Sequence, residues 1–168
     1  MRSLLVLALF AAGCGKEIGD ACIISTDCDP NGQRICDSSQ KEGYCTIQGC
    51  DFDTCPSESE CIRFFTGQFN NKLCNAATED VSTDDCSLDE LCNLEGHCVA
   101  RSSEIRYCMR KCSSNGDCRD GYECRKYSQK DPNNMATFAQ HGGEPVVGPD
   151  ATVDEHTPGF CATKPPST

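Results

Sequence analysis

Cysteine is the residue type in this chain with the most distinctive chemistry, since it accounts for 17 of the 168 residues. Thiols form disulfides, ligate metals or accept lipid, and their spacing helps to discriminate among these roles. The chain contains no C-x-x-C and no C-x-C, and its closest pair is Cys108 and Cys112. Structural zinc sites and thioredoxin-type redox sites favour C-x-x-C. We therefore predict disulfides in an oxidising compartment, with no metal and no cofactor.

The first residues carry a different cysteine signal. Met1-Arg2-Ser3 is positively charged, the run 4–12 is apolar, and Ala11-Ala12-Gly13 places small residues before Cys14. This order is typical of an export signal, and the apolar run is too short to span a bilayer. The segment resembles the signal peptide of bacterial lipoproteins, in which small residues precede the modified cysteine. The resemblance implies that residues 1–13 are removed and that Cys14 carries acyl chains.

Cysteine parity agrees with lipidation, because removing Cys14 from the count leaves sixteen cysteines that can all pair. The alternative is a plain secretory signal with Cys14 as a free thiol. Gly15 follows Cys14, and by analogy with that family the absence of Asp there implies sorting to the cell outer membrane. We expect residues 14–21 to form the lipidated cysteine and a short tether.

The remaining cysteines fall into two sets of eight with similar spacing. Six of the seven gaps agree within two residues, and the dipeptide Tyr44-Cys45 matches Tyr107-Cys108. Such self-similarity indicates repeated structural units. The first set is Cys22, Cys28, Cys36, Cys45, Cys50, Cys55, Cys61 and Cys74. The second set is Cys86, Cys92, Cys98, Cys108, Cys112, Cys118, Cys124 and Cys161.

The predicted fold is small and disulfide-rich, with two tandem four-disulfide modules of short β-hairpins and loops and little helix. Eight cysteines allow 105 pairings in each module, so the connectivity stays open, but we expect every bridge to remain within its module. The predicted ranges are a first module at 22–75, a linker at 76–85, a second module at 86–161 with a long loop at 125–160, and a tail at 162–168.

Charge is unevenly distributed along a chain whose formal net charge is −11. The segment 15–85 has 14 acidic and 5 basic residues, whereas 101–130 has eight basic and four acidic residues. An acidic chain of this kind is not expected to bind nucleic acid. The basic strip is a possible contact with an envelope protein or an anionic polysaccharide, and a solvated face of mixed charge is the favoured alternative. Its residues are Arg106, Arg110, Lys111, Arg119, Arg125 and Lys126.

Two further groups have both a functional and a structural interpretation. Phe64, Phe65 and Phe69 could form an exposed aromatic tip, but a chain so poor in apolar residues favours their use as core. The long loop carries candidate metal ligands, which we expect to be solvated because nothing fixes their geometry. These ligands are His141, Glu144, Asp154 and His156.

No catalytic motif such as G-x-S-x-G, H-E-x-x-H or a P-loop is present, and we predict that the chain is not an enzyme. The segments 18–22, 43–46, 85–87 and 116–124 resemble cysteine-rich lipoproteins that are common in myxobacteria and, more distantly, dickkopf-type and whey-acidic-protein modules. The resemblance implies a lipid-anchored binding or adhesion module of the envelope. An accessory role in an envelope machine such as gliding motility, or inhibition of a secreted hydrolase, are the alternatives.

Overall fold

The computed structural model describes residues 15–66, 72–75, 85–127, 143–149, 151, 153 and 156–164. The described chain is a small disulfide-rich fold built from strands with little helix, as the composition predicts. Cys14 and the signal segment lie outside the described residues, as does 76–84 of the expected linker. Among the helices of the described chain, none has the length and apolar character needed to cross a membrane.

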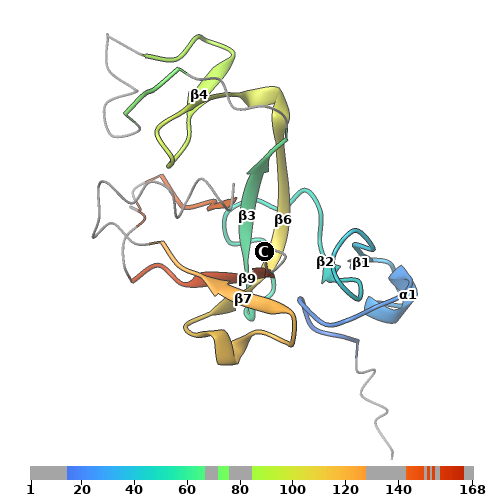
Figure 1. The fold of residues 1–168 in the computed structure, drawn as a ribbon. Coiled ribbons are helices and arrows are strands. Elements are labelled where there is room, and N and C mark those ends of the chain that lie inside the picture. The colour runs from blue at the N-terminus through green and yellow to red at the C-terminus, as the bar shows by residue number, and fades with distance from the viewer. Residues whose placement is uncertain are drawn as a thin grey trace, which may run out of the picture.

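Five strands form one sheet in the order β7-β9-β6-β3-β8. They comprise β3 (Ser59–Phe65), β6 (Glu104–Cys112), β7 (Tyr122–Arg125), β8 (Gly143–Pro145) and β9 (Gly159–Thr163). The antiparallel ladder between β3 and β6 is the spine of the molecule (Figure 1).

Two small hairpins flank this sheet. The first pairs β1 (Ile35–Cys36) with β2 (Cys45–Thr46), and the second pairs β4 (Glu90–Cys92) with β5 (Cys98–Ala100). The helical segments are single turns, namely α1 (Ser25–Cys28), η1 (Arg101–Ser103) and η2 (Asn115–Asp117). The hairpin of β1 and β2 lies beside the spine with α1, and β4 lies beyond one end of the spine (Figure 1).

Eight disulfides organise the chain into four units of four cysteines each. In every unit the first cysteine bonds the third, and the second bonds the fourth. The third and fourth cysteines lie opposite each other in an antiparallel strand pair. The units are Cys22, 28, 36 and 45 (unit one), Cys50, 55, 61 and 108 (unit two), Cys74, 86, 92 and 98 (unit three), and Cys112, 118, 124 and 161 (unit four). Each unit is therefore a strand pair tied by two bridges to the segment that precedes it.

This pairing corrects the expectation that bridges stay within two sequential modules. Cys55 bonds Cys108 and Cys74 bonds Cys92, so two of the eight bridges join the expected halves. The physical reason is nesting, because unit three lies entirely within the long connection between the third and fourth cysteines of unit two. Closing a longer loop adds little entropy cost, so such an insertion is tolerated.

The turn that opens units one and four is held by an aspartate just before the second cysteine. In unit one the Asp27 carboxylate accepts hydrogen bonds from the backbone N–H groups of Ile23 and Ile24, at 2.8 and 3.2 Å. In unit four the Asp117 carboxylate accepts them from Ser113 and Ser114, at 2.7 and 2.8 Å. These backbone donors hold the pKa of both carboxyl groups below the ordinary value of 3.8.

The lowered pKa of Asp117 predicts a specific pH dependence. Its contribution to stability is present above the unfolded-state pKa and is lost as the pH falls through the folded-state pKa. Asp117→Asn keeps an acceptor oxygen but removes the titration, so the thermal midpoint of this variant should fall less steeply than that of the parent below about pH 4. Asp117→Ala removes the acceptor and should lower the midpoint at every pH. Parallel curves for parent and Asp117→Asn down to pH 2 would contradict this role.

The main apolar core lies where the spine meets units one and four. Ile18, Tyr44, Ile62, Tyr122 and Phe160 are almost completely buried there. The core also contains cystine sulfur, which replaces part of the missing aliphatic volume.

The aromatic segment of β3 contributes to this core, as the favoured interpretation expects. The Phe64 ring packs against Tyr107 and Phe160, with ring centroids 6.3 and 6.0 Å apart. Phe65 is half-buried beneath the Arg63 guanidinium, whose central carbon lies 5.6 Å from the ring centroid. Phe69 lies outside the described residues.

Two segments, one expected to be a short tether and the other a long loop, are packed in the structure. Residues 15–21 do not form a free tether, because Ile18 is completely buried and Gly19 donates its backbone N–H to the Cys45 carbonyl. Within the expected long loop, β8 pairs with β3 through Gly143, Glu144 and Pro145. A Cβ on Gly143 would lie 2.7 Å from the Phe160 ring, so only glycine fits at this edge.

Candidate functional site

The six residues of the predicted basic strip do not form one free basic face. Successive side chains of a strand point to opposite faces, so the Lys111 side chain leaves β6 on the face opposite Arg106 and Arg110, although Arg110 and Lys111 both line a cleft near the end of the strand. Arg106 pairs with Asp51 at 2.8 Å and also with Glu104, and Arg110 pairs with Glu17 at 2.8 Å.

Three other residues of the strip also lie near acidic side chains. Lys111 lies 3.9 Å from a Glu60 carboxylate oxygen, and Arg125 lies 3.4 Å from Glu123. Lys126 is exposed beside unit four and helps to lower the pKa of Asp117. Most of the strip is thus already matched by acidic side chains of the same chain.

Arg119 clamps unit four onto unit one. Its guanidinium donates to the backbone carbonyls of Lys41, at 2.8 Å, and Gly43, and it lies over the Tyr122 ring with its central carbon 4.2 Å from the ring centroid. The Tyr122 hydroxyl donates to the same Lys41 carbonyl at 2.9 Å. Arg119 therefore acts mainly inside the fold, which its place in the sequence strip did not indicate.

Two adjoining clefts lie on either side of Arg110, and both are lined by Arg110, Gly116 and Asp117. We call them together the Arg110 groove. The first cleft, of about 320 Å³, lies between residues 17–20, Tyr44 and the Arg119–Tyr122 stack. The second, of about 640 Å³, is bounded by Glu58, Lys111 and Pro158. Three residues of the predicted strip, Arg110, Lys111 and Arg119, thus meet at one groove.

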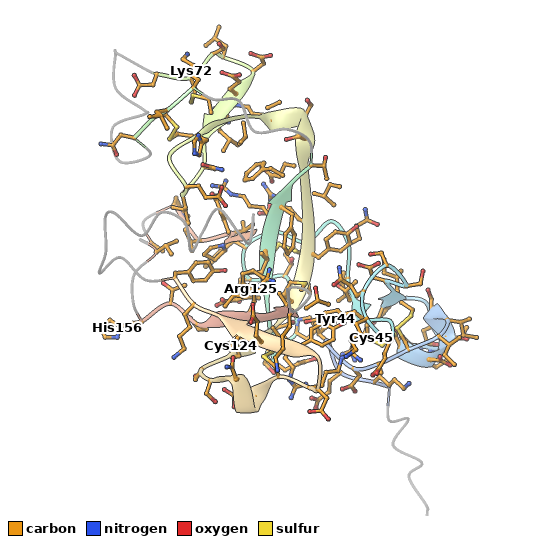
Figure 2. All side chains as sticks on the ribbon, in the orientation of Figure 1. Tyr44, Cys45, Lys72, Cys124, Arg125 and His156 are labelled. Atoms are coloured by element: carbon orange, nitrogen blue, oxygen red, sulfur yellow. A yellow bond between two sulfur atoms is a disulfide. The ribbon has the colours of Figure 1, made fainter. Side chains whose placement is uncertain are left out.

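The floor of the first cleft is rigid and uncharged. The Tyr44 hydroxyl accepts a hydrogen bond from the Arg110 backbone N–H at 3.0 Å, and it lies 3.4 Å from the Cys161 carbonyl, to which it donates. Burial raises the pKa of Tyr44 well above its ordinary range, so the phenol stays neutral. Tyr44 lies where the hairpin of unit one approaches the sheet (Figure 2).

The rim of the groove carries both signs of charge. Glu17, Asp20 and Asp117 face the first cleft together with Arg110 and Arg119. In the second cleft Glu58 and Asp117 face Arg110 and Lys111. A groove with this alternation can pair with donors and acceptors of a polar surface, whereas a single-sign polyanion would meet carboxylates beside every cation.

Glu144 is a buried residue that sequence reasoning placed in solvent. It is 2% exposed, forms an ion pair with Arg63 at 2.7 Å and accepts a hydrogen bond from the Leu94 backbone N–H. Burial raises the pKa of this carboxyl in spite of the Arg63 charge. Glu144 thereby ties β8 to β3 and to unit three, so its role is structural.

Of the other candidate ligands of the long loop, only His156 is among the described residues. His156 is exposed at the periphery of the molecule (Figure 2). His141 and Asp154 lie outside the described residues.

Cysteine sulfurs do cluster, in four groups whose members lie within 4.8 Å of one another, and each group belongs to a single unit. Because these sulfurs are bonded in disulfides, the clusters mark where two bridges pack together.

The polar and charged lining of the Arg110 groove suits it to binding through ion pairs and hydrogen bonds. Comparisons of the chain with family models, with curated proteins and with solved structures found no match.

Proposed function

We propose that this chain is a lipid-anchored envelope protein whose disulfide-stabilised body binds another envelope protein through the Arg110 groove. One observation carries the anchor. The eight bridges use sixteen cysteines, and the seventeenth is Cys14 at the end of the lipobox-like segment. Two or more acyl chains on that residue suffice for stable membrane attachment.

The mixed charge of the groove supports a protein partner over an anionic polysaccharide. Arg110 and Arg119 are already neutralised by Glu17 and Glu42 of the same chain. A polyanion would have to displace these carboxylates, whereas a polypeptide can supply both charges at matching positions. The rigid frame of units one and four favours such binding, because little side-chain or loop entropy is lost.

Lys111 gives the sharpest test of the groove, since its amino group is partly exposed and its pairing with Glu60 is long. We expect Lys111→Gln to reduce partner capture from envelope extract by about twofold to fivefold at low salt, the effect of one exposed ion pair. The difference from the parent should shrink at high salt.

Arg101→Gln provides the matched control, because Arg101 is an exposed cation in η1 and does not line either cleft. This variant should retain the parent level of capture. Equal losses for Lys111→Gln and Arg101→Gln would attribute binding to overall charge, and an unchanged Lys111→Gln would contradict the groove.

A further inference from the structure

The N-terminal turn of unit one presents two adjacent apolar side chains to solvent. Ile23 is 87% exposed and Ile24 is 57% exposed, immediately before α1. Exposed isoleucines are ordinary when single, but a consecutive pair on a chain with so few apolar residues is costly to leave in water.

These side chains are held outward by the fold. The backbone N–H groups of Ile23 and Ile24 both donate to the Asp27 carboxylate, and the disulfides of Cys22 and Cys28 fix the two ends of the turn. The turn therefore cannot fold the isoleucines back against unit one without losing these bonds.

Gly15, the residue that follows the proposed lipidation site, lies near this turn. The Cys28 carbonyl oxygen stands 3.3 Å from the position that a Cβ on Gly15 would occupy, so Gly15 packs against the end of α1. The four residues of α1 span only about 6 Å, and consecutive Cα atoms are about 3.8 Å apart. The Gly15 Cα is therefore within about 15 Å of Ile24, and the proposed lipidation site is the residue bonded to Gly15.

The segment between these points is anchored as well. The Lys16 amino group donates to the Ala21 carbonyl at 2.7 Å, and Ile18 is buried in the core. Acyl chains on Cys14 would thus leave the body next to the isoleucines, with no free tether to separate the body from the bilayer.

We propose that the turn carrying Ile23 and Ile24 inserts into the phospholipid interface and holds unit one directly against the membrane. This inference rests on the lipidation of Cys14 in the proposed function. The nearby charges are mixed, since Lys16 lies close enough to Asp27 to help lower its pKa and Arg34 pairs with Glu58 at 3.7 Å, so insertion depends on apolar burial and not on anionic lipid. A phospholipid bilayer is the occupant, because the covalent anchor would already bring it to this face.

The chain contains no tryptophan, so one introduced indole reports on its own environment. Ile23→Trp places it at the turn. Leu88→Trp is the matched control, because Leu88 is 99% exposed in unit three, whose β4 strand lies at the far end of the molecule from α1 (Figure 1). Mass spectrometry first tests whether Cys14 is lipidated in each variant, and vesicle flotation tests whether the variant binds. Each lipidated variant is then bound to phosphatidylcholine vesicles with or without brominated acyl chains.

We expect bromolipid to quench the emission of Ile23→Trp at least twofold, with a blue shift that high salt does not reverse, and to leave Leu88→Trp unquenched. Flotation without quenching at Ile23→Trp would overturn the insertion and leave the anchor intact. A blue shift without bromolipid quenching would assign the turn to a protein contact and overturn it too. An unmodified Cys14 with no flotation would overturn the proposed anchor and the insertion together.

Discussion

Complete reduction and alkylation of the eight disulfides should unfold the described body at neutral pH. Each bridge typically contributes about 2–4 kcal/mol, and a domain of this size is stable by only about 5–15 kcal/mol. The core offers little to offset that loss, since its main cluster has only eleven buried residues and three of them are half-cystines. Proton NMR should show collapse of amide dispersion in the alkylated chain and its retention in a sample carried through the procedure without reductant. Retained dispersion after full alkylation would show that burial alone holds the fold.

Replacing Cys55 and Cys108 together by serine should give the largest loss among removals of a single bridge. This disulfide closes 53 residues, which corresponds to about 4 kcal/mol of loop-closure entropy, and Cys108 is fully buried in the spine. The neighbouring bridges shorten the effective loop and reduce this value, so the comparison between two bridges is the firmer measure.

The matched control is the removal of Cys86 and Cys98, whose bridge closes 12 residues in the peripheral hairpin of unit three, or about 3 kcal/mol by the same relation. Denaturant unfolding should place the Cys55/Cys108 variant below the Cys86/Cys98 variant in free energy of unfolding. The reverse order would mean that the bridge between the halves does not support the spine.

The cysteine pattern correctly indicated a repeated, strand-based fold, but the repeat has half the expected length. Tyr44 and Tyr107 directly precede the fourth cysteines of units one and two, Cys45 and Cys108. The match between Glu60-Cys61 and Glu123-Cys124 likewise aligns third cysteines. In both matches the aligned cysteines hold the same position within their units.

The alignment fails at Cys86, which is the second cysteine of unit three and was matched with the first of unit one. Spacing could not reveal this shift, because unit three is inserted within unit two and loop length carries little energetic penalty.

The candidate site was only partly predictable for a related reason. Arg110, Lys111 and Arg119, which are close together in the sequence, also line one groove in the structure. Their acidic partners Glu17, Glu60 and Glu42 come from distant positions, and so does the Arg63 partner of Glu144. The composition of a segment gives its net charge. It does not show which distant carboxylate pairs with each cation, because that depends on tertiary contacts.

Mass spectrometry of a non-reduced digest tests the four-unit architecture most directly. The four-unit architecture predicts peptides that link Cys55 to Cys108 and Cys74 to Cys92, because these two bridges join the two halves of the chain. A digest in which every bridge stays within residues 22–74 or within residues 86–161 would contradict it.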